Sequence, residues 1–132
     1  MKLIEFSFDG TPVSFQTNNR IRKRAYMNRI TALASGIIAS NIPNLNDELE
    51  AKITYFYQSN TDLDIDNIIK PILDSLNGVF YTDDSQISEV NSKRIDLNGS
   101  YIIENNTPLL ATQLTKGIEF VYFELFKYKS IF

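Results

Sequence analysis

The stretch from Asp62 to Asp84 constrains this chain more than any other feature. It holds six of the sixteen acidic residues of the sequence. Like charges a few ångströms apart repel one another, so crowded carboxylates need a cation, basic side chains or bulk water around them. The same stretch carries apolar residues at helical spacing, namely Ile65, Ile68, Ile69, Ile72, Leu73 and Leu76. This spacing predicts a short helix with one buried face over about residues 66–77.

Breaker residues limit this helix. Proline lacks the amide hydrogen that an inner helical residue donates, so Pro71 suits a first turn and places the helix start near Asp66 or Asn67. Gly78 is a natural stop. Asp64 and Asp66 are two residues apart in the extended approach and project to the same side. Lys70 lies one helical turn beyond Asp66.

Composition limits the chemistry that these acids can perform. The 132 residues contain no cysteine and no histidine, which excludes disulfides, Ser-His-Asp chemistry and most zinc sites. A metal ion here needs oxygen ligands, which points to magnesium, manganese or calcium. A hydrophobic content of 43% and a charged content of 22% are ordinary for one soluble globular domain over residues 1–132. No apolar run reaches a membrane span, an early acid argues against a signal peptide, and the missing cysteines fit a cytoplasmic protein.

The rest of the chain predicts an α+β domain with a mixed sheet of about five strands and two main helices. Alternating, β-rich segments predict strands at residues 2–8, 49–58, 86–97 and 117–127. The last of these is apolar enough for both its faces to be covered. Asn98-Gly99 predicts a hairpin into a further strand at 101–103, and residues 104–116 are polar and irregular. A helix capped by Asn18 or Asn19 is predicted to reach about Ser40, with a buried stripe of Tyr26, Ile30, Leu33 and Ile37.

Positive charge gathers at the start of that helix, although the net charge of the chain is −3. Residues 18–29 contain no acid and several basic residues, among them Arg20, Arg22, Lys23 and Arg24. Cations at a helix N-terminus oppose the helix dipole, so an anionic partner explains them better than helix stability does. A solvated basic face is the competing interpretation.

Three interpretations of the acidic stretch compete. The first is an EF-hand, whose D-x-D-x-D opening it shares, but that loop needs glycine and glutamate where this chain has Asn67 and Leu73. The second is structural: the acids cap a helix, pair with Lys70 and form a turn at Asp83-Asp84. The third is an all-carboxylate magnesium site for phosphoryl chemistry. It needs the next strand to return beside the helix start, so that the carboxylates converge.

The run D-I-D-N-I-I-K-P-I-L-D-S-L-N-G from Asp64 to Gly78, followed by V-F-Y-T-D-D-S-Q-I, resembles the signature of the RusA-type Holliday junction resolvases. The shared order is D-x-D-N, a lysine four residues later, an Asp-x-Leu near the helix end and an Asp-Asp pair before a strand. The segment G-T-P-V-S-F-Q from Gly10, with the arginines after it, is also similar to that family. The similarity spans about residues 10 to 95.

This resemblance implies a homodimeric endodeoxyribonuclease that nicks four-way junctions, with branched DNA as its partner. It implies that Asp64, Asp66 and Asp84 bind magnesium, with Asp83 beside them and manganese as a substitute ion. It also implies that Lys70 is needed for cleavage. We expect the basic residues at positions 20–24 to contact DNA phosphates.

The sequence departs from the family pattern at one place, and two other functions are compatible with it. Family members often carry a basic residue and proline just before the first motif aspartate, where this chain has Asp62 and Leu63. The departure bears on junction affinity and selectivity rather than on the metal chemistry. The alternatives are a DNA-binding protein of the same fold without nuclease activity, and a nuclease for flaps or other branched DNA.

Overall fold

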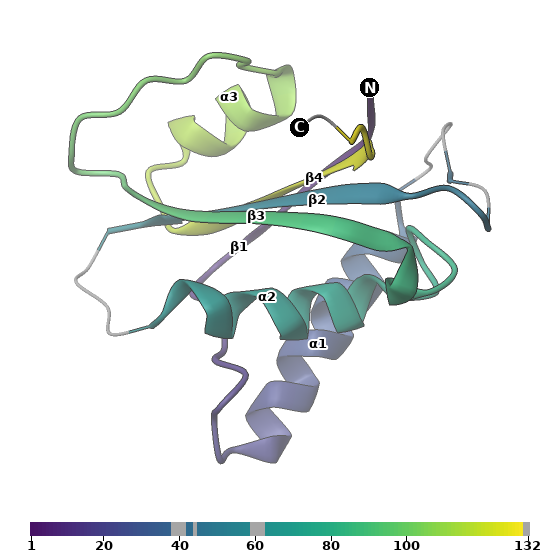
Figure 1. The fold of residues 1–132 in the computed structure, drawn as a ribbon. Coiled ribbons are helices and arrows are strands. Elements are labelled where there is room, and N and C mark those ends of the chain that lie inside the picture. The colour runs from purple at the N-terminus through teal and green to yellow at the C-terminus, as the bar shows by residue number, and fades with distance from the viewer. Residues whose placement is uncertain (38–41, 44, 59–62, 131–132) are drawn as a thin grey trace.

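The structure is a computed structural model that describes residues 1–37, 42–43, 45–58 and 63–130. Within these residues, one sheet has the strand order β1-β4-β2-β3. Its strands are β1 (Lys2–Asp9), β2 (Leu49–Tyr57), β3 (Ile87–Asp96) and β4 (Phe120–Lys127). The helices are α1 (Arg20–Ser35), α2 (Ile65–Leu76) and α3 (Pro108–Thr115), with a short 3-10 helix, η1, at Asp84–Gln86. Helices α1 and α2 cover one face of the sheet, and α3 lies on the other (Figure 1).

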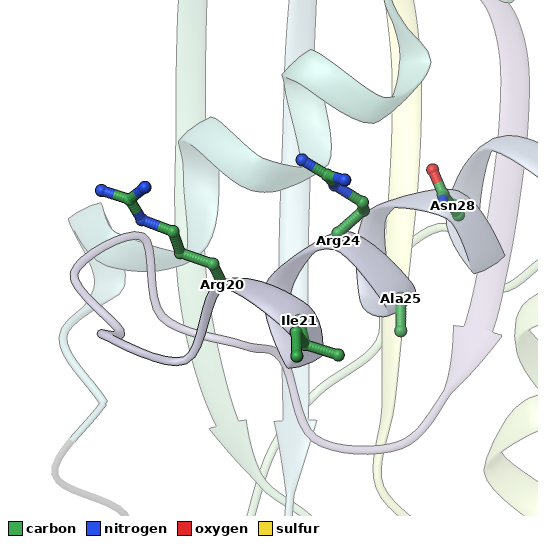
Figure 2. A pocket seen from close by; sticks show the side chains of 5 residues that line it. All are labelled: Arg20, Ile21, Arg24, Ala25 and Asn28. Atoms are coloured by element: carbon green, nitrogen blue, oxygen red, sulfur yellow. The ribbon is translucent and has the colours of Figure 1, made fainter.

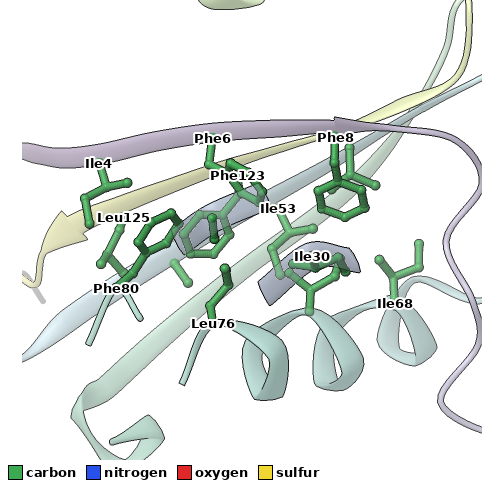
Figure 3. Close-up of a cluster of buried hydrophobic side chains, with 14 of the residues drawn as sticks. Ile4, Phe6, Phe8, Ile30, Ile53, Ile68, Leu76, Phe80, Phe123 and Leu125 are labelled. Carbon is green, nitrogen blue, oxygen red and sulfur yellow. The ribbon is translucent and has the colours of Figure 1, made fainter. Parts of the chain in front are cut away.

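The main core lies between the sheet and the pair α1 and α2. Alternate residues of β1 point into it, and Ile4, Phe6 and Phe8 are all buried (Figure 3). The rings of Phe6 and Phe80 meet edge to face at 5.6 Å. Each such buried side chain contributes about 1.5–3 kcal/mol by leaving water. The alternation predicted for this strand is therefore confirmed.

A smaller core fills the space between α3 and the opposite face of the sheet. It contains Phe56, Leu110, Phe120 and Tyr122, and the rings of Phe56 and Phe120 stack at 4.5 Å. Strand β4 contributes to both cores, because Phe123 points the other way, into the main core. The prediction that both faces of the terminal strand are covered is confirmed.

The unit β2-α2-β3 determines where the acidic stretch lies. Strand β2 pairs with β3 in parallel and with β4 in antiparallel orientation. A parallel connection requires the chain to cross back along the sheet, and α2 makes that return. The first residues of α2 therefore lie near the end of β2, and its last residues lie near the start of β3.

Helix α1 differs from the prediction in its end and in its buried stripe. It ends at Ser35, and residues 38–40 of the predicted helix lie outside the described residues. Its buried residues are Tyr26, Ile30 and Ala34, whereas Leu33 is 44% exposed and Ile37 is 38% exposed. The contact follows one row of residues four apart, the ridge by which helices commonly pack. The predicted buried stripe was therefore wrong at Leu33 and at Ile37.

Two further predictions about the C-terminal third were wrong. Residues 101–103 form no strand; the chain leaves the sheet after the Asn98-Gly99 turn, and Ile103 packs into the smaller core. The sheet thus has four described strands rather than about five. The segment 104–116, expected to be irregular, contains α3. The missed signal was Thr107-Pro108, since the Thr107 hydroxyl accepts from the Leu110 amide as an N-cap and proline suits the first helical position.

Candidate active site

Two carboxylates stand at the start of α2. Asp64 is the N-cap residue, with an extended backbone, but its side chain makes no capping hydrogen bond. Asp66 lies in the first turn, where negative charge interacts favourably with the helix dipole. Both side chains are exposed, and neither has a hydrogen-bond or ion-pair partner within the part of the chain that the structure describes. Their oxygens are therefore available to a hard cation.

Pro71 explains how this end of α2 is held. Helix α2 begins at Ile65, slightly before the predicted start, so Pro71 lies in its second turn rather than its first. The missing amide hydrogen leaves the carbonyl of Asn67 without its helical donor. The amide of Phe15 donates to that carbonyl instead, at 2.9 Å. The loop before α1 is thereby attached to the first turn of α2.

The basic cluster predicted to bind DNA divides into two kinds of residue. Lys23 turns back onto the loop: its Nζ donates to the Phe15 carbonyl at 3.1 Å and lies 4.4 Å from the centre of the Phe15 ring. Arg20, Arg22 and Arg24 are exposed. Figure 2 shows the side chains of Arg20 and Arg24 extending from one side of α1. Both residues line a shallow depression with a volume of about 410 Å³.

That side of α1 is the one next to α2. Arg24 and Thr31 are seven residues apart, two helical turns, and so share a face. The Thr31 hydroxyl donates to the Ser75 carbonyl of α2 at 2.7 Å. The hydrogen bond from the Phe15 amide to the Asn67 carbonyl joins the loop before α1 to the first turn of α2. The two helices therefore begin at the same end of the molecule. Arginine side chains and the Asp64–Asp66 pair consequently lie at the same end of the helical layer.

Arg94 is a cation near the acidic pair that sequence reasoning missed. Its Nη1 donates to the carbonyl of Leu63 at 3.0 Å, and its guanidinium lies 5.8 Å from the centre of the Tyr57 ring. The alternation of side chains along the strand was the available signal. Arg94 pairs with Tyr55, whose side chain faces the helical layer, so the side chain of Arg94 faces that layer too. The bond fixes the chain one residue before Asp64. Asp62, the other departure from the family pattern, lies outside the described residues.

The second acidic pair is built differently, because Asp83 is an N-cap. Its carboxylate accepts from the amide and hydroxyl of Ser85, and these bonds lower the pKa of Asp83. The side-chain oxygen of Gln86 accepts from the Asp83 amide at 3.2 Å, which completes a capping box. Gln86 also donates to the Asp47 carbonyl at 3.1 Å. The Asp-x-x-Gln spacing was a readable signal for this structural role.

Asp84 is the member of this pair with an uncommitted side chain. It is exposed, and no hydrogen bond or ion pair of its carboxylate occurs among the described residues. Tyr81 is buried nearby, and its hydroxyl donates to the Leu73 carbonyl. Burial, followed by the negative charges of Asp84 and Asp74, raises the pKa of Tyr81. Asp84 therefore lies beside the C-terminal half of α2.

The two acidic groups do not meet within one chain. Asp64 lies next to Leu63, which contacts Arg94 near the end of β3, whereas Asp84 precedes the start of that strand. Arg94 lies seven residue positions after Ile87 along the strand, a span of about 23 Å. Among the residues described, no group of three or more acids could hold one metal ion. Convergence was predicted on the condition that the next strand returns beside the start of α2. The parallel crossover instead places the two acidic pairs at opposite ends of α2, so this condition is not met among the described residues of one chain.

Lys70 lies between these ends on the outer side of α2. Its Nζ is 3.3 Å from Oδ1 of Asp74, and the two side chains are 55% and 34% exposed. The predicted neighbour one turn earlier, Asp66, makes no such bond. Lys70 is thus an accessible cation positioned by one weak surface ion pair.

Comparison with known proteins gives one family. The family described as Endodeoxyribonuclease RusA matches residues 10–104, which include both acidic pairs, Lys70 and the basic start of α1. No curated protein matches the chain. Within the described residues, no helix has the length and apolar character needed to cross a membrane.

Proposed function

Because this chain belongs to the RusA family of endodeoxyribonucleases, we propose that it is a magnesium-dependent enzyme that nicks four-way DNA junctions. Family membership implies endonuclease activity on Holliday junctions, with branched DNA as substrate. The observation that carries the ion requirement is the pair of exposed carboxylates at the start of α2, which make no hydrogen bond or ion pair with any described residue. The missing cysteines fit a role in the cytoplasm.

The donor set fits a hard divalent ion. Asp64 and Asp66 offer exposed carboxylate oxygens, the ligands that magnesium and manganese prefer. Asp84 offers a third, whereas the oxygens of Asp83 are engaged by Ser85. Such an ion activates water and stabilises charge on a phosphodiester. Asp64, Asp66 and Asp84 are accordingly the proposed ligands, and Asp83 is proposed to position Asp84.

The cations have separate proposed roles. Lys70 contacts the scissile phosphate or the leaving oxygen, where a pre-positioned positive charge stabilises the transition state. Arg20 and Arg24 bind backbone phosphates on the side of α1 next to α2. Arg22 lies two residues from each of them, on a different side of the helix, and contacts phosphates from there. Lys23 supports them by holding the loop at Phe15.

A complete set of acids requires two copies of the chain. A two-fold axis that sets two α2 helices antiparallel would bring Asp84 of one copy toward Asp64 and Asp66 of the other. Two equivalent sites then result, which suits a junction with two equivalent strands to nick. We therefore propose a homodimer whose metal sites are shared between copies.

The primary experiment compares nicking of a mobile four-way junction with that of matched duplex and flap DNA, with and without Mg²⁺. We expect junction nicking that depends on Mg²⁺ and is supported by Mn²⁺. Junction binding without nicking in either ion would identify a DNA-binding protein instead. Preferential cutting of the flap would identify a different branched substrate.

A mixing experiment tests the shared site. Asp66→Asn and Asp84→Asn should each abolish nicking when assayed alone. If each site draws on both copies, a heterodimer of the two variants contains one site with every wild-type acid. Mixing, after exchange of subunits, should therefore restore activity, at no more than about half of the wild-type level per dimer. If each site were instead built within a single chain, every site in the heterodimer would lack one acid, and mixing would restore no activity.

A further inference from the structure

Phe15 is a large apolar side chain that the fold leaves accessible. It is 41% exposed and belongs to neither core of the described residues. The other phenylalanines in the described part of the chain are buried or partly buried. Burying an aromatic ring stabilises a fold substantially. Core packing therefore does not explain why a phenylalanine stands at this position.

The backbone of Phe15 is nevertheless held from two sides. Its amide donates to the Asn67 carbonyl at 2.9 Å, and its carbonyl accepts from Nζ of Lys23 at 3.1 Å. Phe15 is also a central residue of a turn, which a hydrogen bond of 3.1 Å from the Thr17 amide to the Ser14 carbonyl closes. The loop thus presents the ring from a fixed position. Such pre-organisation lowers the cost of binding a partner.

This position is next to the proposed metal site. The Phe15 amide bonds to Asn67, which follows Asp66 by one helical position, a rise of about 1.5 Å. Adjacent phosphates of one DNA strand are about 3.4 Å apart along the duplex axis. A phosphate held through Asp66 therefore brings the bases on either side of it close to Phe15.

The charges around Phe15 indicate what its ring binds. Nζ of Lys23 lies 4.4 Å from the centre of the ring. Arg20 precedes Lys23 by three residues, so the two cations are neighbours on α1. Cations beside an accessible aromatic ring favour a partner that is both anionic and planar, as a nucleobase with its phosphates is. Lys23 lies over one face of the ring, so a base has the opposite face on which to stack.

We propose that Phe15 stacks on a nucleobase at the branch point of the junction, beside the phosphate that is cut. Within a continuous duplex, neighbouring bases cover both faces of each base, and exposing a face costs stacking energy. The stack is interrupted at a branch point, so a base face is available there at lower cost. The ring would select branched DNA and set the position of the cut relative to the branch. This role rests on the proposed function and adds to it a residue that recognises DNA structure.

The absence of tryptophan from the chain makes a fluorescence test specific. Phe15→Trp introduces a single indole, and a nucleobase that stacks on an indole quenches its emission. The control is Ile102→Trp, at an 88% exposed position in the segment before α3. Without metal, a four-way junction should quench Phe15→Trp strongly and matched duplex DNA much less, whereas Ile102→Trp should respond weakly to both. Equal quenching of the two variants, or equal quenching by the two DNAs, would overturn the proposal.

Junction affinity gives an independent readout. Phe15→Leu keeps an apolar side chain but removes the aromatic face, whereas Phe15→Tyr keeps that face. Loss of one base–aromatic stack should weaken junction binding by about 5-fold to 150-fold, with little change for duplex DNA. Phe15→Tyr should bind junctions within a few-fold of the wild type. Unchanged junction affinity in Phe15→Leu, or an equal loss in Phe15→Tyr, would refute stacking.

Failure of the stacking role is distinguishable from failure of the proposed function. Junction-specific quenching in a protein that nicks no junction with Mg²⁺ or Mn²⁺ would reject the nuclease and keep the role of Phe15. Junction nicking by a protein whose Phe15→Leu variant binds and cuts as the wild type does would keep the nuclease and reject the role of Phe15.

Discussion

Replacing Lys70 with alanine separates a structural role from a chemical one. The change removes an ion pair of 3.3 Å between side chains that are 55% and 34% exposed. Surface pairs of this kind contribute about 0.3–0.5 kcal/mol, and lysine before aspartate is the weaker order on a helix. In a chain of this length the melting temperature should fall by about 1–2 °C. Folding and junction affinity should be almost unchanged.

The expected loss of rate is much larger. A cation that touches the reacting phosphate acts in the transition state, and deleting one such stabiliser lowers the rate on the order of 10²-fold or more. That corresponds to about 2.7 kcal/mol, several times the ion-pair contribution. Lys70→Arg should not restore the rate, because a planar guanidinium does not occupy the place of a compact ammonium.

The assay is single-turnover cleavage of a pre-bound junction at saturating Mg²⁺, with thermal melting in parallel. Asp74→Asn is the matched control, since it removes the same ion pair and leaves the ammonium in place. We expect Asp74→Asn to cleave within a few-fold of the wild type while Lys70→Ala does not. Equal rates for the two variants would refute a catalytic role and leave Lys70 as a surface residue.

Four further outcomes follow from the site. Asp66→Asn should abolish cleavage while the protein still folds and binds junctions, because asparagine keeps the shape of the side chain but weakens the ion site. Loss of the circular dichroism signal in this variant would show that Asp66 has a structural role. Gln in place of Arg20 and Arg24 should lower the salt dependence of DNA binding by about one unit of slope per contact. Lys23→Gln should instead cost about 0.5–1 kcal/mol of stability with little change in slope. Hydrogen bonds from Ser85 lower the pKa of Asp83 in the folded protein. The charged carboxylate therefore stabilises the fold at pH values above 3.8, the ordinary pKa of an aspartate, and this contribution is lost as the pH falls below 3.8. The difference in melting temperature between Asp83→Asn and the wild type at pH 7 should therefore shrink as the pH falls below 3.8, and the variant should retain cleavage if Asp83 only caps η1.

The sequence determined the parts of this protein that depend on neighbouring residues. Helical spacing from Ile65 to Leu76 predicted α2, and alternation along β1 predicted its buried face, because periodicity reports burial directly. The apolar run before Lys127 predicted a strand covered on both faces. The acidic motif was equally visible, since it is a local pattern of residue types.

Tertiary structure decided how those parts meet. Asp66 and Asp84 lie close in sequence, but the parallel pairing of β2 and β3 separates them by the length of α2, and pairing is a property of the whole sheet. Lys23 turned toward Phe15 because Pro71 left a carbonyl of α2 for that loop. Arg94 reached Leu63 only through strand register. Such contacts join residues distant in the chain, and their geometry is set by packing and hydrogen bonding that no local pattern encodes.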